Sequence, residues 1–114
     1  MAIRHIVFIA PTKCFEGADF DVVLKFYDLT GAGEIPATLK WQVYDKDTGF
    51  SMIVEQTVAV PAQTVTITMT AAVNAMNDET KPSEVRSLEV RTTHAGGRVF
   101  NELYEYGLYN LVGA

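Results

Sequence analysis

Apolar and polar residues alternate along much of the chain with a period of two, which is typical of strands that bury one face. In the segment 19–28, one face carries four apolar side chains: Phe20, Val22, Leu24 and Phe26. In 37–45, the corresponding inward residues are Leu39, Trp41 and Val43. In 63–70, three apolar residues alternate with threonines, which are β-branched and tolerate water on an outer face. These segments are predicted to be strands.

Residues typical of turns separate the predicted strands. The segment 29–36 holds two glycines and a proline, Asp-Lys-Asp-Thr-Gly at 45–49 precedes a strand at 50–54, and 94–98 separates strands at 85–93 and 99–112. One short helical connector is predicted from Thr70 to Met76, because Thr70 is a suitable N-cap and alanines follow it. About seven strands without β-α-β alternation predict an all-β, antiparallel two-sheet sandwich with Trp41 in its core.

Both terminal strands carry more apolar surface than a strand with one wet face needs. In the first, 3–9, Ile6 and Phe8 lie on one face while Val7 and Ile9 lie on the other. The last strand is rich in aromatic residues, and Gly107 within it predicts a bulge that changes the face pattern. We therefore expect a partner subunit to cover these strands. The predicted interface residues are Ile6, Phe8, Tyr104, Tyr106 and Tyr109. A Phe8→Asp substitution is accordingly expected to abolish assembly and to leave the sandwich folded.

Length and composition restrict the class of protein. The 114 residues suit one domain, 1–114, and a 48% hydrophobic content suits a globular chain. The net charge is −5, and no two of the nine lysines and arginines are adjacent, so nucleic acid is not an expected partner. No apolar run approaches the ~18 residues that a membrane span needs, so no membrane partner is expected. The single cysteine, Cys14, cannot form an internal disulfide and is expected to be a half-buried apolar side chain.

No motif in the chain indicates catalysis, a metal or a cofactor, so the protein is expected not to be an enzyme. The two histidines, His5 and His94, lie in a strand and in a glycine-rich turn, and no serine lies in a Gly-x-Ser-x-Gly elbow. The segment 45–49 begins like a calcium loop, but the twelfth position is Gln56 where an EF-hand has Glu. A polar hairpin turn is the favoured interpretation of that segment.

Tyrosines on outward faces leave a second function open. Tyr27 and Tyr44, on successive predicted strands, would form a platform on which a sugar ring stacks, and the chain would then be a carbohydrate-binding adhesion module. A third possibility is a chaperone-like or regulatory domain that binds a peptide. For Tyr104, Tyr106 and Tyr109, an interface or core position is preferred.

Several short segments resemble the immunoglobulin-like modules of tailed-bacteriophage virion proteins, such as the amino-terminal domain of baseplate upper proteins. The segment Phe15-Glu-Gly-Ala-Asp19 and the alternating strand after it resemble the opening of these modules. The strand 39–43, the Thr-Ala-Ala at 70–72 and the glycine-rich hairpin within 88–100 resemble their later parts. The likeness spans about residues 15–112, although Ala18 follows Gly17 where the family has Asp.

The resemblance implies an immunoglobulin-like sandwich that builds a virus particle and performs no chemistry. Under this hypothesis the chain is a capsid decoration (cement) protein or else a tail or baseplate accessory, and a lone domain favours the former. Its partners are other virion structural proteins, within a homo-oligomer or a symmetric array. Its location is the virion, after assembly in the host cytoplasm.

Overall fold

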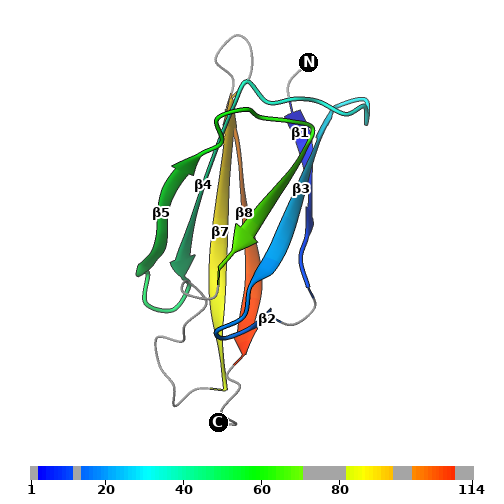
Figure 1. Ribbon diagram of the computed structural model, residues 1–114. Coiled ribbons are helices and arrows are strands. Elements are labelled where there is room, and N and C mark those ends of the chain that lie inside the picture. Colours follow the sequence, from blue (N-terminus) through cyan, green and yellow to red (C-terminus); the bar gives the residue numbers. More distant parts are fainter. Residues whose placement is uncertain (1–2, 12–13, 71–81, 94–98, 110–114) are drawn as a thin grey trace.

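The computed structural model describes residues 3–11, 14–70, 82–93 and 99–109, which form eight strands (Figure 1). In chain order these are β1 (Ile3–Ile9), β2 (Cys14–Phe15), β3 (Phe20–Asp28), β4 (Thr38–Asp45), β5 (Ser51–Thr57), β6 (Thr64–Met69), β7 (Ser83–Thr93) and β8 (Val99–Tyr109). The described residues contain no helix, and 71–76 of the predicted helical connector lies outside them. The all-β prediction is therefore confirmed.

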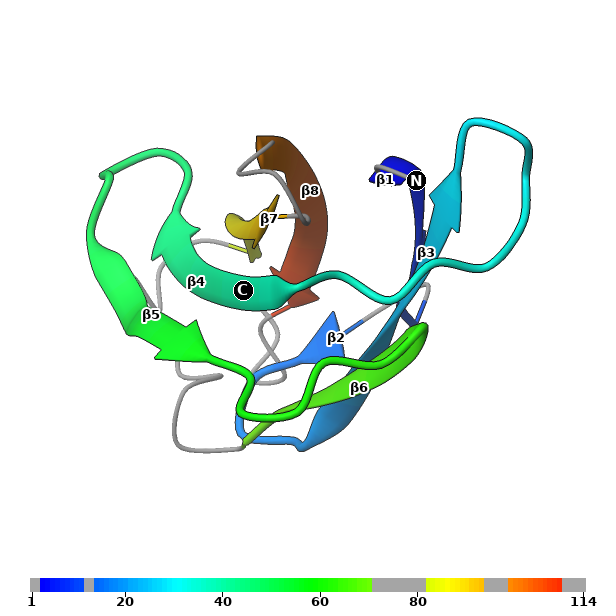
Figure 2. The same cartoon turned by 90° about the horizontal axis from the view of Figure 1, so that it is seen from above.

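The strands form two layers, which are seen from above in Figure 2. One sheet has the order β1-β3-β6, and the other has the order β2-β8-β7-β4-β5. All neighbours are antiparallel except β2 and β8, which run parallel, so the prediction of a wholly antiparallel fold is wrong at this pair. The order matches an immunoglobulin-like sandwich in which β3 and β6 correspond to strands B and E, and β4, β7 and β8 to C, F and G.

The core lies between the two sheets and consists mainly of the inward residues that the alternation predicts. Val22, Leu24 and Phe26 of β3 are 0% exposed, and so are Leu39 and Val43 of β4. Ile67 and Met69 of β6 and Leu88 and Val90 of β7 complete the centre. Trp41 packs against this core but is only partly buried. The predicted faces of β3, β4 and β6 are thus confirmed, and Trp41 lies nearer the rim than expected.

Strand β8 keeps one uninterrupted register with β7, from Thr93 opposite Val99 to Ser83 opposite Tyr109. The bulge predicted at Gly107 is therefore absent. The glycine has another role, because a Cβ at this position would lie 3.1 Å from the ring of Tyr109. Gly107 leaves space for that ring on the outward surface of β8. Alternation in β8 continues through the glycine and separates Tyr104 and Tyr106 from Tyr109.

The turn at 45–49 is a hairpin turn, as predicted, and Asp45 organises it. The Asp45 carboxylate accepts hydrogen bonds from the amides of Asp47 (2.9 Å) and Thr48 (3.1 Å), and Gly49 adopts a φ of 75°. A second aspartate does the same after β3: Asp28 accepts from the hydroxyl and amide of Thr30, and these bonds hold its carboxyl pKa below the usual range. Both turns place a short polar side chain where the backbone amides need an acceptor.

The first and last long strands meet at one flank of the sandwich, although they belong to different sheets. The rings of Phe8 in β1 and Tyr104 in β8 are stacked, with centroids 4.6 Å apart and planes 11° apart. The Tyr104 hydroxyl also donates a hydrogen bond to the carbonyl of Ile6 at 3.3 Å. Burial of this hydroxyl raises the pKa of Tyr104, so the group stays protonated and able to donate. The aromatic pair closes this flank.

We predict that Phe8→Asp destabilises the sandwich by about 3 kcal/mol or more, because it removes an aromatic ring and places a charge against the core. This corrects the expectation that the substitution would spare the fold. The measurement is urea unfolding followed by tryptophan fluorescence. Ile9→Asp is the matched control, since Ile9 points outward and is 46% exposed; it should cost about 1 kcal/mol or less. Equal losses of stability in the two variants would contradict the placement of Phe8 on the inward face of β1 and of Ile9 on its outward face.

Candidate functional site

The five residues predicted to form an interface do not form one surface. Ile6 and Tyr106 are each 6% exposed and belong to the core of their own chain. Phe8 and Tyr104 also point inward and are partly buried against that core. Only Tyr109 lies on the outward face of its strand. The even-numbered residues of β1 and β8 fill the sandwich, so the apolar side chains of the terminal strands are not all surplus to the fold.

Apolar side chains lie side by side on the outward face of the β1-β3-β6 sheet, and the most exposed of them is Ile9, at 46%. Val7 and Ile9 of β1 point outward beside two residues of β3, since Ile9 is opposite Val23 and Val7 is opposite Lys25. Tyr27 continues this face, with its ring centroid 6.1 Å from that of His5. We call Val7, Ile9, Val23 and Tyr27 the β1–β3 patch. The sequence pattern already separated Val7 and Ile9 from Ile6 and Phe8, but it could not show which pair faced the core.

A second outward aromatic contact lies where β2 joins β8. The rings of Phe15 and Tyr109 have centroids 6.3 Å apart, and the Glu16 amide donates to the Tyr109 carbonyl at 3.0 Å. Phe15 is 39% exposed. This contact is smaller than the β1–β3 patch and fastens β2 to the end of β8.

Tyr27 and Tyr44 cannot form one sugar platform. Tyr27 lies on the outward face of the β1-β3-β6 sheet, and Tyr44 lies on the outward face of the other sheet, opposite Ser87. The connection 29–37 crosses from one sheet to the other, so the outward faces of β3 and β4 are on opposite sides of the molecule (Figure 2). The two strands are consecutive in the sequence, and the sequence does not show that they belong to different sheets.

The outward face of the larger sheet is polar where β4, β5 and β7 lie side by side, and its charges pair with one another there. Gln42 donates to Glu89 at 2.7 Å, and Arg91 contacts both Glu89 (3.2 Å) and Glu55 (3.7 Å). Lys40 lies 3.9 Å from the same Glu55. Such exposed pairs contribute little to stability and remain hydrated. This face is therefore a poor candidate for an apolar docking surface.

The most exposed apolar side chains lie outside the β1–β3 patch. Val60 (83%) and Leu29 (76%) lie in connections between strands, and Val54 (69%) and Leu103 (58%) lie on β5 and β8 of the larger sheet. Single exposed apolar residues are ordinary on protein surfaces. They therefore do not by themselves indicate a binding site.

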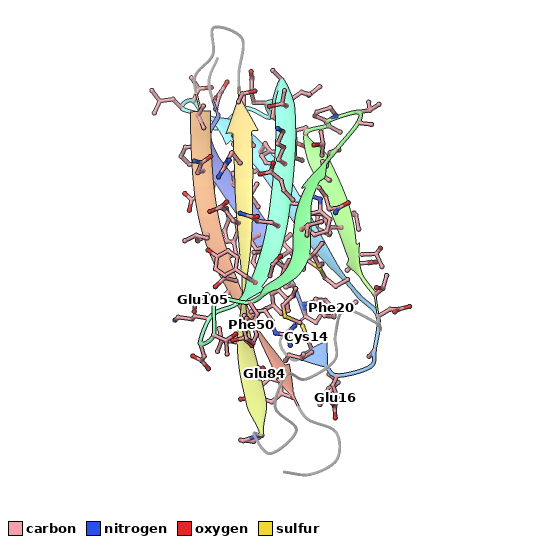
Figure 3. The ribbon with its side chains drawn as sticks, turned by 90° about the vertical axis from the view of Figure 1, so that its left-hand side faces the viewer. Cys14, Glu16, Phe20, Phe50, Glu84 and Glu105 are labelled. Carbon is pink, nitrogen blue, oxygen red and sulfur yellow. The ribbon has the colours of Figure 1, made fainter. Side chains whose placement is uncertain are left out.

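A buried ionic cluster lies at the lower end of the sandwich. Arg86 of β7 is 0% exposed, and its Nε lies 3.7 Å from Asp45 Oδ2 while its Nη2 lies 3.6 Å from Glu84 Oε1. Both carboxylates are also buried. Figure 3 shows Glu84 near Cys14 and Phe20 in this part of the molecule. Because the acids and the base partner each other, the cluster is explained by the fold itself.

The Tyr106 side chain lies beside this cluster. Its ring packs edge-on against Phe20, with centroids 5.3 Å apart, and its buried hydroxyl has no hydrogen-bond partner among the described residues. Burial raises the pKa of Tyr106 to about 12. Burial likewise raises the pKa of the Cys14 thiol, which is 2% exposed, so Cys14 is more buried than predicted. Neither group has the lowered pKa that a nucleophile needs.

Metal-ligating side chains do not gather in the part of the chain that the structure describes. Within it, no group of three His, Cys, Asp or Glu residues could hold a metal ion. Of the candidate acids, Asp45 caps its turn and contacts Arg86, and Asp21 accepts from the Thr68 hydroxyl at 2.7 Å. His94 lies outside the described residues. A search of the described residues also finds no helix that is long and apolar enough to span a membrane.

Comparison with known proteins supports the fold alone. No protein-family model and no curated protein matches the sequence. Among solved structures, a superoxide reductase (neelaredoxin) from Ignicoccus hospitalis is similar over 93% of this chain and 81% of that chain, with a TM-score of 0.58 and 16% identity. CopC from Methylosinus trichosporium OB3b is similar over 94% and 96% of the two chains, with a TM-score of 0.51 and 18% identity.

Murine CRIg is also similar, over 94% of this chain and 98% of that chain, with a TM-score of 0.52 and 10% identity. At such identities the likeness concerns the path of the backbone and does not extend to activity. The three proteins carry unrelated names on related sandwiches, and none of them is a phage protein. What this chain does must therefore be argued from its own surfaces.

We predict that Arg86→Met destabilises the protein by about 3–5 kcal/mol, because two buried carboxylates lose the cation between them. Arg91→Met is the matched control, since the Arg91 side chain is 46% exposed in its ion pairs; it should cost about 1 kcal/mol or less. The measurement is chemical denaturation of both variants at pH 7. A loss at Arg86 no larger than that at Arg91 would show that the cluster is solvated.

We predict that Tyr106→Phe leaves stability at pH 7 unchanged or raises it by up to about 1 kcal/mol, because the lost hydroxyl has no partner among the described residues. In the wild type, stability should fall as pH rises from about 10 to about 12. Over that range the unfolded tyrosine has lost its proton while the folded one retains it. Between pH 7 and pH 11, the free energy of unfolding should fall less in the variant than in the wild type. A clear loss at pH 7 would reveal a partner for the hydroxyl.

Proposed function

We propose that the chain is a non-catalytic structural subunit of a tailed-bacteriophage particle and acts by docking onto neighbouring virion proteins. A capsid decoration protein is the preferred role, and a tail or baseplate accessory is the other. Its partners are virion structural proteins, within a homo-oligomer or a symmetric array assembled in the host cytoplasm. In this role the fold supplies rigid surfaces, and symmetry repeats each contact many times.

The observation that carries this proposal is the β1–β3 patch. A sheet with one wet face normally presents polar residues outward, as β4 and β7 of the larger sheet do around Glu89 and Arg91. The smaller sheet instead presents Val7 and Ile9 of β1 beside Val23 of β3, and Tyr27 lies beyond Lys25 on the same face. Contiguous outward apolar residues of this kind mark surfaces that another protein covers. The residues are held on paired strands and are therefore already arranged for docking.

The resemblance to phage virion modules supports a phage particle as the assembly to which this chain belongs. The segments at 15–28, 39–43 and 88–100 resemble immunoglobulin-like modules of phage virion proteins, and they form β2–β3, β4 and the β7–β8 pair of the sandwich. The carbohydrate-binding alternative loses its main support, because Tyr27 and Tyr44 lie on opposite faces. No other observation in the described residues favours it.

The first test is mass spectrometry of density-purified particles from the source lysate, with copy number measured against a major structural protein. We expect the chain at tens to hundreds of copies per particle, and the number distinguishes a shell decoration from a tail ring. Absence from particles would overturn the proposal. A glycan-binding screen of the purified domain would then be the next experiment.

We predict that Ile9→Asp reduces incorporation into particles about tenfold or more, because an exposed apolar contact becomes a charge that docking would have to desolvate. Quantification of the variant chain in purified particles is the measurement, with thermal melting to show that the sandwich is folded. Val54→Asp is the matched control, because Val54 is an exposed aliphatic residue on the other sheet. Equal incorporation of the two variants would exclude the β1–β3 patch as the docking surface.

A further inference from the structure

Strand β6 is an uncovered edge of the smaller sheet. The order β1-β3-β6 leaves one side of β6 without a neighbouring strand among the described residues. In constant-type immunoglobulin domains, a fourth strand, D, lies beside the strand that corresponds to β6. Here β5 belongs to the other sheet, and the connection 58–63 leads directly into β6. No strand of the described residues therefore occupies the position of strand D.

The uncovered side of β6 displays its threonines. The Phe26 amide donates a hydrogen bond to the carbonyl of Gln63 (3.0 Å), and the register then makes Val65, Ile67 and Met69 the residues that bond to β3. The N–H and C=O groups that point away from β3 therefore belong to the alternate residues, which are Thr64, Thr66 and Thr68. The side chains of these three threonines are exposed on the outward face of the sheet.

Strand β6 also lacks the features by which proteins protect an edge strand. Edge strands are usually protected by charged side chains, prolines or bulges. The segment Thr64–Met69 contains no charged residue and no proline, and its register with β3 is unbroken. The other long edge strands differ: β1 shows a register shift against β3 between Ile3 and His5, and β5 contains Glu55 and shows register shifts against β4. Strand β6 is therefore the edge best suited to pairing.

We propose that β6 pairs antiparallel with β6 of a second copy of this chain, about a twofold axis at Thr66, to form a continuous six-stranded sheet. This inference rests on the proposed assembly function and deepens it by naming the partner of one contact. The axis brings Thr66 opposite Thr66 of the second copy and Thr64 opposite Thr68. These are the residues whose backbone groups point outward from the edge, so each pair can exchange two hydrogen bonds.

The side chains are self-complementary in this register. On the outward face, threonine meets threonine, a favourable cross-strand pair. On the inward face, Val65 meets Ile67 of the second copy, which extends the core across the junction. A shift of one residue would place inward side chains opposite outward ones and is excluded by the pleat. The two faces of the dimer sheet thus keep the character of the two faces of the monomer sheet.

The charges of β3 are compatible with this axis, and their attraction is weak because both β6 strands lie between them. Lys25 lies opposite Thr64, and Asp21 lies opposite Thr68 and accepts its hydroxyl hydrogen bond. With the axis at Thr66, Lys25 of one copy falls in the same cross-strand row as Asp21 of the other, and this occurs twice. An axis at Ile67 would instead place the apolar Val23 in the row of Asp21. For β5, an axis at Val54 would oppose Ile53 to Glu55, and an axis at Glu55 would oppose two like charges.

The size of the contact indicates a weak dimer. Pairing of one short edge strand buries less than the about 1,200 Å² of the smallest stable complexes. Self-association of the isolated chain is therefore expected at high protein concentration, whereas a symmetric array would strengthen it by repetition. This behaviour suits a subunit that must remain separate until it assembles.

The test is sedimentation velocity of the purified chain over a range of concentrations, with substitutions at the twofold axis. Thr66→Lys and Thr66→Glu each place like charges opposite each other, so each variant alone should have a dimer dissociation constant raised about tenfold or more. An equimolar mixture of the two variants should associate again, because the ammonium group of one variant would then face the carboxylate of the other across the axis. The substituted residue is exposed, and thermal melting verifies that each variant is folded.

Gln56→Lys and Gln56→Glu are the matched controls, because Gln56 is an exposed residue of the edge strand β5. Both should associate like the wild type, alone and mixed. A wild-type chain that stays monomeric at millimolar concentration, or a mixture that fails to associate when the wild type does, would overturn the β6 dimer. Particle incorporation is measured separately, so a monomeric chain that still enters particles would reject this inference and leave the proposed function standing.

Discussion

The stacking of Tyr104 on Phe8 is the contact on which the arrangement of the surfaces depends. It joins strands from different sheets at one flank, and the bond from the Tyr104 hydroxyl to the Ile6 carbonyl fixes their relative position. Because Ile6 and Phe8 are thereby turned inward, the pleat of β1 must turn Val7 and Ile9 outward. One internal contact therefore closes the sandwich at β1 and β8 and, at the same time, creates the apolar surface on β1. The opposite edge of the smaller sheet, β6, has no such closure among the described residues.

The two outer faces then differ for a physical reason. On the larger sheet the charged side chains pair with one another: Lys40 and Arg91 lie near Glu55, and Arg91 also contacts Glu89. The free energy needed to remove these charges from water would exceed the free energy gained by burying them. The smaller sheet has few charges, and its two charged outward residues on β3, Asp21 and Lys25, lie at different rows. The outward face of β1 and β3 is therefore better suited to docking by apolar burial than this charged part of the larger sheet. The buried cluster of Arg86, Asp45 and Glu84 belongs to the fold and contributes no surface.

The alternation in the sequence predicted the inward faces of β3, β4 and β6, since each of those strands has one clearly apolar face. The alternation does not show which face is buried in a strand whose two faces are both apolar. In β1 the period does not show which face packs on β8, and Ile6 and Phe8, the pair predicted for the interface, face the core. In β8 the predicted bulge at Gly107 would have placed Tyr109 with Tyr104 and Tyr106, whereas unbroken pairing with β7 separates them. The sheet to which a strand belongs, which separates Tyr27 from Tyr44, depends on contacts between distant segments and has no local signal.

Pairing at β6 would also change what the β1–β3 patch presents to a partner. In a continuous six-stranded sheet, the row that contains Ile9, Val23 and Thr66 runs through the twofold axis into the same row of the second copy. The dimer would thus display two apolar patches on one face, separated by a strip of threonines. A partner that binds one patch weakly could bind both with the gain that a second linked contact supplies. Threonine suits the strip, because it favours strand structure and remains hydrated before the partner arrives. The modest patch on each chain would in this way become sufficient for stable attachment only after two copies have met.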